Sequence, residues 1–218
     1  CLVGSEMCIR DRVGGAYGLL MSDAMPKKDE NGNTVLTWND DFRAAYAQRS
    51  GTAEEVGSLV PKLMTSMSTG ITWKNLSLRV ALDARFGGKV ASYSNKYGQA
   101  YGYTERSLDF RDTEHGGLTW TSNYADSKGM TFHDGVIPEG VFEAGTIVTG
   151  VDGKQHHVGG QSFAQLVKDG VLEPVHASTW HYWTNSWGTG TVNDYWLEDL
   201  NYIALREITL SYRIPNNI

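Results

Sequence analysis

The stretch Leu76–Phe86, "LSLRVALDARF", alternates apolar and polar residues almost without interruption. The residues of one parity are apolar: Leu76, Leu78, Val80, Leu82, Ala84 and Phe86. The other parity holds the polar and charged residues Ser77, Arg79, Asp83 and Arg85. Because successive side chains of a strand point to opposite faces, this pattern predicts a β-strand with one apolar and one polar face. Which face meets water decides between a soluble sandwich and a membrane barrel.

The preceding stretch Leu63–Trp73, "LMTSMSTGITW", has a similar alternation. Only Lys74-Asn75 separates the two stretches, which is the length of a tight hairpin loop. The cross-strand pairs expected on the apolar face are Trp73 with Leu76, Ile71 with Leu78, Thr69 with Val80 and Met67 with Leu82. Both apolar rows then fall on the same side, so the two patterns together predict a β-hairpin.

The composition of the chain favours strands and turns. The 218 residues carry a formal net charge of −6 and include 25 Gly, seven Trp and eleven Tyr. No block of like charge is long enough to indicate a nucleic-acid partner. The sequence also lacks an apolar run of about 18 residues, as a membrane helix needs, whereas barrel strands alternate and produce no such run.

Both cysteines, Cys1 and Cys8, lie in the opening segment "CLVGSEMCIRDR". This string resembles translated sequencing-adapter read-through; the alternative is a genuine internal segment of a longer chain. It has none of the three regions of a signal peptide. We therefore expect residues 1–12 to lie outside the fold, and the chain to be an internal fragment cut at both ends. The remaining sequence has no cysteine, which predicts neither a disulfide nor thiolate chemistry.

Shorter elements follow from local signals. Asn31-Gly32 predicts a tight turn, and Phe42–Gln48 a short helix. Asp152-Gly153 predicts a hairpin turn. Ser162 is expected to cap a helix that ends before Gly170. A structureless loop of more than a hundred residues is improbable, so the tract that contains the last two elements is expected to fold on itself.

A third alternating stretch, "NYIALREITLSYRIPNN", predicts a strand near the end of the sequence. Its apolar row is Ile208, Leu210, Tyr212 and Ile214, opposed by Glu207, Thr209, Ser211 and Arg213. Arg206 and Glu207 are adjacent, so a regular strand is expected to point them to opposite faces, which argues against an acid–base pair. Pro215 and the two asparagines after it are expected to begin a turn.

Three observations favour a membrane barrel. The two hairpin stretches are eleven residues each, about the length of a tilted transmembrane strand. A two-residue turn at one end contrasts with a very long excursion at the other, as in outer-membrane barrels. Trp73 and Tyr212 lie near the short turn, where an aromatic girdle is expected. In this interpretation Arg79, Asp83 and Arg85 face a wet lumen, because a charge facing lipid is costly.

Two motifs resemble those of one transporter family. "VPKLMTSMSTGITWKNLSLRVALDARFGGKV" resembles the hairpin near the C-terminal end of SusC/RagA-type TonB-dependent outer-membrane transporters, with its Pro-led strand, its "yKn" turn and its "rfGGk" ending. "NYIALREITLSYRIP" resembles the family's "syvRLREisLsYslP" strand, with Ala204 where Arg is usual. The segments "HGGLTW" and "DGVIPEGVF" resemble its large extracellular loop.

The resemblance implies a barrel of about 22 strands around an N-terminal plug, in the outer membrane of a Gram-negative bacterium. It implies import of oligosaccharides or peptides, energised by the TonB complex through a part that this sequence lacks. A SusD-like surface lipoprotein is the implied partner, with outer-membrane lipid around the barrel and no nucleic acid. Such an importer performs no covalent chemistry, so neither an enzyme nor a cofactor is expected.

The resulting fold class is all-β, a fragment of a large antiparallel transmembrane β-barrel with a long extracellular loop subdomain. The expected parts are barrel strands with one outer loop over 13–93, including the turn at 73–76, then the loop subdomain over 94–200, and a strand with the start of a periplasmic turn over 201–218. A secreted soluble β-sandwich that binds carbohydrate is the alternative, and would cover the apolar face with a second sheet.

Candidate site residues lie mainly in an aromatic stretch. Trp180, Tyr182, Trp183 and Trp187 suit sugar rings or a partner's surface; alternatively they form the loop subdomain's own core. The best metal candidates are His156, His157, His176 and His181. No zinc-type spacing accompanies them, so we expect solvated loop histidines and no metal site. Asp83, Glu143 and Glu173 have no spacing that supports a glycosidase pair.

Overall fold

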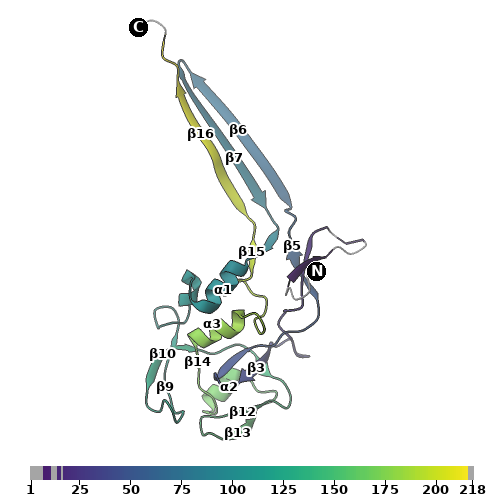
Figure 1. The fold of residues 1–218 in the computed structure, drawn as a ribbon, viewed down its shortest axis with the longest axis vertical. Coiled ribbons are helices and arrows are strands. Elements are labelled where there is room, and N and C mark those ends of the chain that lie inside the picture. Colours follow the sequence, from purple (N-terminus) through teal and green to yellow (C-terminus); the bar gives the residue numbers. More distant parts are fainter. Residues whose placement is uncertain (1–6, 11–13, 16, 216–218) are drawn as a thin grey trace.

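The computed structural model describes residues 7–10, 14, 15 and 17–215. It is mostly β, with 41% strand and 14% helix. Figure 1 shows two parts, a long three-stranded sheet and a compact body at one end of it. The long sheet consists of β6 (Leu63–Trp73), β7 (Leu76–Phe86) and β16 (Tyr202–Tyr212). Apart from the turn at 74–75 and the residues after β16, the remaining described residues form the body.

The long sheet confirms the predicted hairpin. Strands β6 and β7 pair antiparallel along their full length, with Trp73 opposite Leu76 and Thr69 opposite Val80. Lys74 takes the left-handed backbone conformation in the two-residue turn, at φ 53°. Strand β16 pairs with the other edge of β7 and places Tyr212 opposite Leu76. Within the described residues this sheet is open and does not close into a barrel.

A β-bulge in β16 overturns one expectation. The register with β7 shifts between Leu205 and Glu207, so Arg206 and Glu207 together oppose Ala81. A bulge inserts one extra residue and changes the parity of the strand beyond it. The prediction that Arg206 and Glu207 point to opposite faces was therefore wrong: Arg206 reaches Asp83 on the polar face, and Glu207 accepts a hydrogen bond from Thr209 on that same face.

The parity change keeps the apolar face of the sheet continuous. Leu205 lies opposite Leu82 and Ile203 opposite Ala84, beside the apolar row of β7. Without the bulge, both side chains would point to the polar face, because they differ in parity from Ile208. The apolar face thus combines rows from all three strands: Leu63, Met67, Ile71 and Trp73, the six residues of β7, and Ile203, Leu205, Ile208, Leu210 and Tyr212.

Glycines connect the long sheet to the body. Gly87 and Gly88 follow β7 with φ values of 80° and 88°, which favour glycine. A Cβ on Gly87 would lie 3.0 Å from the backbone nitrogen of Lys62, so the two chain segments approach closely. The amide of Gly87 donates to Asn201 Oδ1 at 2.7 Å, which joins this corner to the start of β16.

The body contains five small sheets, three α-helices and one short 3₁₀ helix. Its strands before the long sheet are β1 (Met7–Arg10), β2 (Leu19–Ser22), β3 (Val35–Asn39), β4 (Ala44–Ala47) and β5 (Glu54–Ser58). Its later strands are β8 (Lys89–Ala91), β9 (Leu118–Thr121), β10 (Thr131–Val136), β11 (Val141–Phe142), β12 (Ile147–Thr149), β13 (Gln155–His157), β14 (Val175–His176) and β15 (Leu197–Asp199). The helices are α1 (Tyr93–Tyr101), η1 (Glu105–Leu108), α2 (Phe163–Lys168) and α3 (Ala177–Asn185). Strand pairs are antiparallel except β3 with β11.

Two hydrophobic clusters hold the body together. The larger one packs α2 against β3, β4 and β11 and includes Leu36, Ala45, Phe142, Phe163 and Leu166. The smaller one lies closer to the long sheet and includes Leu20, Ala24, Val192 and Trp196. Each cluster joins residues that precede the hairpin to residues that follow it. The body therefore uses Leu19–Ser58, which we expected to belong mainly to barrel strands and one outer loop.

The shorter predicted elements have mixed outcomes. The turn at Asn31-Gly32, the hairpin at Asp152-Gly153 and the helix capped by Ser162 are confirmed. The predicted helix over Phe42–Gln48 was wrong, because Ala44–Ala47 is strand β4, buried and paired with β3. Helices α1 and α3 were not foreseen.

Several end regions lie largely outside the described residues. The adapter-like segment 1–12 is one of them, although Met7–Arg10 forms β1 and pairs with β2. We had expected this segment to lie outside the fold. The turn expected from Asn216 onward is also outside the described part. No helix among the described residues is long and apolar enough to cross a membrane.

Candidate functional site

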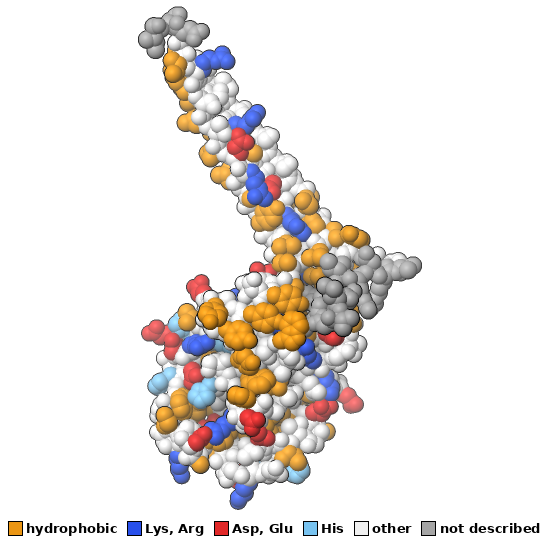
Figure 2. Space-filling view, in the orientation of Figure 1, with side chains coloured by type: hydrophobic (Ala, Val, Ile, Leu, Met, Phe, Trp, Pro, Cys, Tyr) orange, Lys and Arg blue, Asp and Glu red, His pale blue; other side chains and the backbone are white. Residues whose placement is uncertain are grey.

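The polar face of the long sheet carries an ion pair at the bulge. The guanidinium of Arg206 binds the carboxylate of Asp83 through two nitrogens, with Nη2 2.9 Å from Oδ2 and Nε bound to Oδ1. The hydroxyl of Tyr202 donates to the same carboxylate at 3.4 Å. Such a two-point contact fixes the bulged residue in position, because the planar fork of arginine matches a carboxylate. Figure 2 shows charged side chains along the visible side of the long sheet.

The three predicted lumen-facing residues lie on this polar face. Arg79 lies between Gly70 of β6 and Thr209 of β16, and Asp83 lies between Ser66 and Ala204. Arg85 lies at the end near the body, where its Nη2 donates to the carbonyl of Leu59 at 2.8 Å. Arg85 therefore ties the sheet to the body. The structure thus brings the three residues onto one face, together with Arg206, which the sequence argument had left out.

The apolar face of the long sheet has no cover among the described residues. Ile71 is 64% exposed and Leu210 is 67% exposed. Figure 1 shows no second layer over this sheet. The described residues therefore lack the second sheet that a sandwich would place over the apolar rows of β6, β7 and β16.

The four aromatic residues predicted as contacts differ in how they pack, although Tyr182 and Trp183 meet edge-to-face at 5.4 Å. Trp180 packs against the larger cluster, edge-to-face with Phe110 at a centroid distance of 5.4 Å. Trp183 stacks on Tyr46 at 5.3 Å. Tyr182 and Trp187 remain exposed, at 39% and 56%.

Helix α1 adds an aromatic row that sequence reasoning missed. Tyr93, Tyr97 and Tyr101 recur every four residues and so lie along one helix face, a spacing that could have revealed the helix. Tyr97 stacks on Trp187 at 6.4 Å, and Tyr101 meets Tyr182 edge-to-face at 5.9 Å. Figure 2 shows hydrophobic side chains gathered over α1 and α3, beside the base of the long sheet.

A buried lysine anchors α1. Lys96 has no exposed surface, and its Nζ lies 3.6 Å from the ring centroid of Trp196. Tyr97 and Trp187 lie farther out, at 5.1 and 5.6 Å. These rings provide cation–π attraction for the ammonium group. The lysine thereby links α1 to the smaller hydrophobic cluster.

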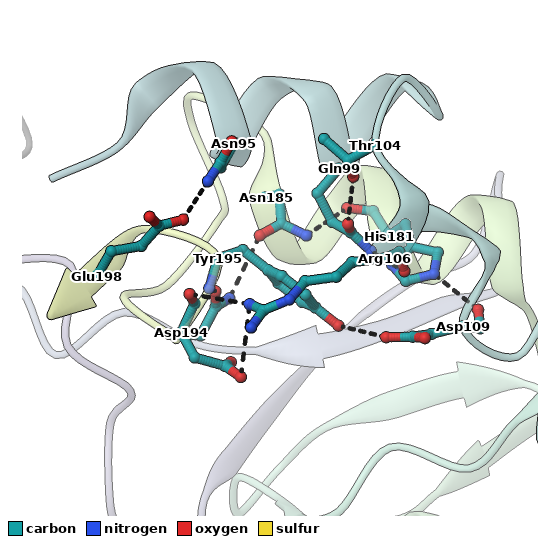
Figure 3. Close-up of polar contacts among 11 residues, drawn as sticks. Asn95, Gln99, Thr104, Arg106, Asp109, His181, Asn185, Asp194, Tyr195 and Glu198 are labelled. Carbon is teal, nitrogen blue, oxygen red and sulfur yellow. Dashed lines mark hydrogen bonds and ion pairs between the residues drawn. The ribbon is translucent and has the colours of Figure 1, made fainter. Parts of the chain in front are cut away.

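His181 is one of the residues joined by the polar contacts in Figure 3. Its Nδ1 is 2.8 Å from Nε2 of Gln99, and its Nε2 is 2.8 Å from the carbonyl of Asp109. Because the carbonyl can only accept and the amide nitrogen can only donate, the imidazole is neutral with its proton on Nε2. Burial lowers the pKa of His181, since the charged form would lose its hydration. The expectation of a solvated histidine was wrong here.

The surrounding contacts join α1 to β15, and join the end of α3 and the residue after η1 to the segment before β15. Asn95 Nδ2 binds Glu198, and the hydroxyl of Tyr195 donates to Asp109 at 3.2 Å. Burial, followed by the nearby Asp109 charge, raises the pKa of Tyr195 to about 12. Both ring nitrogens of His181 are occupied, so the imidazole has no position left for a metal ion or for proton transfer. This network is therefore structural.

Two of the other candidate histidines each pair with one carboxylate. His156 Nε2 is 2.8 Å from Asp152, and His176 Nδ1 is 3.1 Å from both carboxylate oxygens of Asp134. Among the described residues, no three His, Cys, Asp or Glu side chains are grouped as a metal site would need.

Several clefts open on the body, and two of them are lined by several aromatic rings. The larger, about 540 Å³, is mainly apolar and is lined by Tyr46, Phe110, Leu118, Ile137 and Trp180. The second, about 300 Å³, lies between the β9–β10–β14 sheet and the turn of the β3–β4 hairpin. Its lining combines aromatic rings with carboxylates. Of the predicted contact residues, only Trp180 reaches either cleft.

Comparison with known proteins gives no relative from which a function could be transferred. No model of a protein family matches the chain, and no curated protein matches it significantly.

Proposed function

We propose that this chain is part of an outer-membrane importer of the SusC/RagA type, with the long sheet as barrel strands and the body outside the membrane. One observation carries the proposal: the continuous apolar face of the long sheet is covered by no described segment. Large exposed apolar faces mark contact with a membrane or a partner. Lipid is the environment that matches an apolar face of this length.

The dimensions of the long sheet support lipid contact. Each of its three strands has eleven residues. At about 3.3 Å per residue and a tilt of about 40°, such strands span roughly 28 Å along the membrane normal, close to the apolar band of about 25 Å in outer-membrane barrels. An ordinary strand of five or six residues would be too short.

The side chains at the turn end also support it. Trp73 and Tyr212 flank Leu76 on the apolar face, beside Lys74 in the turn. Aromatic rings prefer the membrane–water interface, and a lysine beyond them reaches water. The opposite face carries Arg79 and the Asp83–Arg206 pair, groups that a water-filled lumen would hydrate.

The free edges of the sheet fit a larger assembly. Strands β6 and β16 are edge strands, and each leaves a row of backbone groups unpaired within the described residues. In the proposed barrel these edges pair with neighbouring strands. The plug, the TonB-contacting part, a SusD-like lipoprotein and an oligosaccharide or peptide substrate belong to the same proposal and derive from the sequence resemblance alone.

Site-directed spin labelling tests the lipid-facing row. Cys1 and Cys8 are replaced by Ser, and single cysteines are placed at positions 78, 80 and 82 and at 77, 79 and 81 in the chain reconstituted in lipid vesicles. Labels on the first row are expected to collide with dissolved oxygen, and labels on the second with a water-soluble nickel chelate. A label at exposed Glu30 in the body is the aqueous control. Equal nickel access on both rows would contradict membrane insertion.

The import function needs a second experiment. Uptake and lipoprotein capture are measured in cells that express the parent transporter. The same measurements are made in cells that express its Arg79→Ala or Asp83→Asn variant, each changed on the polar face. The spin labels could show lipid contact while both variants keep unchanged uptake and unchanged lipoprotein capture. That result would support a sheet in the membrane and contradict the proposed import function. Lost uptake with normal outer-membrane abundance supports it.

A further inference from the structure

The larger of the two aromatic-lined clefts has the size of a small-ligand site. Its volume is about 540 Å³, within the range of about 300–1,000 Å³ that is typical of such sites. Its walls come from strand β4, from strands β9 and β10, and from helix α3. The aliphatic part of the lining is Leu36, Leu118, Val136, Ile137 and Pro138. A ligand in this cleft would therefore exchange water mainly for apolar contacts.

Aromatic rings form another part of the wall. Phe110 meets Trp180 edge-to-face, with the ring centroids 5.4 Å apart and the ring planes at 88°. The ring of Tyr46 stacks on Trp183 at 5.3 Å and 9°, so helix α3 holds it in place. Because aromatic rings favour edge-to-face and offset-stacked partners, this wall suits the ring of a ligand.

The backbone of Phe110 is strained where its ring reaches the cleft. Its φ of 63° lies in the left-handed region, which a bulky residue rarely adopts. A hydrogen bond from its amide to the carbonyl of His115, at 2.9 Å, holds this conformation. Strained residues cluster at ligand sites, where the surrounding structure enforces them. The strain therefore supports a binding role for the wall to which this ring belongs.

The hydroxyl of Tyr46 is a polar group that the cleft offers to a ligand. The side chain is 8% exposed, yet its hydroxyl makes no hydrogen bond with the described residues. Unlike the hydroxyl of Tyr124, it is not sealed from the surface. Burial raises the pKa of Tyr46, so the phenol stays protonated at neutral pH and can both donate and accept a hydrogen bond. A largely buried polar group without a partner is costly, which points to a ligand that supplies one.

The rest of the lining argues against other classes of ligand. Among the described residues that line the cleft, only Glu139 is charged, and its carboxylate would repel an anion. A sugar would bring several hydroxyls into a mainly apolar cleft, where most of them would lose their hydrogen bonds to water without replacement. The lining thus favours an aromatic ligand with a single neutral polar group.

We propose that this cleft binds the phenol ring of a tyrosine side chain in a peptide. The ring packs against Phe110 and Trp180, and its hydroxyl forms a hydrogen bond with the hydroxyl of Tyr46. The cleft is larger than one ring, so it has room for the main chain beside that ring. This site does not depend on the proposed transport function, because every residue that lines it belongs to the body.

The test compares two water-soluble amides that differ only in the hydroxyl, N-acetyl-tyrosinamide and N-acetyl-phenylalaninamide. Each is titrated calorimetrically at neutral pH into the full chain in a nonionic detergent, with the detergent alone as the blank. The tyrosine amide is expected to bind about fivefold more tightly, which is the contribution of one neutral hydrogen bond. Methyl glucoside should bind at least about tenfold more weakly than either amide, because it has no aromatic ring to bury.

A variant of Tyr46 assigns the hydrogen bond. Tyr46→Phe should weaken binding of the tyrosine amide about fivefold and leave the phenylalanine amide unchanged, so that the two amides bind equally. Tyr182→Phe is the matched control, because Tyr182 lies outside the lining of the cleft. Loss of that hydroxyl should change neither affinity.

A second pair of variants locates the ring. Leu118 lines the cleft and is 44% exposed, so Leu118→Trp can place an indole there without disturbing the core. It should weaken both amides at least about tenfold. Leu108→Trp, at a residue 46% exposed and outside the lining, should change neither. This pair remains informative if Y46F does not fold. Equal affinity of the unaltered chain for the two amides, tighter binding of the glucoside, or unchanged amide affinities in L118W would overturn the proposal.

Discussion

The long sheet and the body cover their apolar side chains to very different degrees. In the body, Phe142 and Phe163 are at most 1% exposed because a helix and several short strands enclose them. In the long sheet, Ile208 is 66% exposed although it belongs to an equally regular apolar row. Alternation alone therefore forms a strand in both regions, whereas burial requires a second layer.

The two regions also differ in what specifies them. The hairpin of β6 and β7 joins residues that are close in sequence, and a two-residue turn sets its register. In the body, β3 pairs with β11 across more than a hundred residues, and Trp196 packs against Leu20. Contacts between residues close in sequence thus specify the long sheet, but its apolar face needs an environment outside the described residues to cover it. Contacts between residues far apart in sequence specify the body, which has its own hydrophobic core.

A matched pair of leucine truncations tests this comparison most strongly. Leu166→Ala in the body removes a side chain that is 1% exposed and should destabilise the body by about 2–5 kcal/mol, through lost burial and the cavity left behind. Leu210→Ala on the long sheet should cost less than about 1 kcal/mol, because that side chain is 67% exposed. Chemical denaturation in nonionic detergent, followed by tryptophan fluorescence, measures both. Equal losses would mean that the apolar face is covered after all.

A charge introduced on either face of β7 sharpens the comparison. Val80→Arg places a guanidinium on the apolar face near mid-strand and should destabilise the chain in lipid vesicles by about 2–4 kcal/mol. Ala81→Arg, one residue away on the polar face, should have little effect. Denaturant titration in vesicles measures the difference. Similar stabilities for the two variants would contradict a lipid-facing row.

Much of the long sheet could be predicted from sequence, because a period of two residues and a short turn determine face and register together. The bulge was missed, because the alternation on each side of Arg206 is locally regular. The sequence signal for the bulge is that the apolar residues occupy odd positions up to Leu205 and even positions from Ile208 onward. It marks a bulge wherever both apolar rows must share one face.

Less of the body and its sites could be predicted. The cap at Ser162 and the glycine turns are local signals, and they were sufficient for α2 and two turns. The burial of His181 could not be inferred, because Gln99 and Asp109 come from a distant segment. The cleft around Trp120 was missed for the same reason: its walls come from the β3–β4 turn and from strands far along the chain.

The pH dependence of stability tests the buried histidine. The folded pKa of His181 is lowered below its ordinary value of 6.5, so the unfolded chain takes up the proton first as the pH falls. The histidine's contribution is therefore fully present above about pH 6.5 and is lost as the pH falls toward the lowered folded pKa. The slope should reach about 1.4 kcal/mol per pH unit. Urea titrations from about pH 7.5 to 5 should show a smaller slope in His181→Gln, and an unchanged one in a variant of exposed His157. A slope unaffected by H181Q would mean that the imidazole is not held neutral.

The smallest expected effect concerns a purely local signal within the body. The hydroxyl of Ser162 accepts a hydrogen bond from the amide of Gln165 at 3.2 Å and caps α2. Ser162→Ala should cost about 1 kcal/mol, whereas Ser162→Asp should keep the cap and most of the stability. Amide exchange of α2 together with denaturation of the whole body measures the loss. Because this cost is below that expected for Leu166→Ala one turn later, the pair of variants separates what the local sequence contributes to the helix from what the distant strands contribute. A larger loss in S162A than in L166A would reverse that order and make the body, like the hairpin, a locally specified unit.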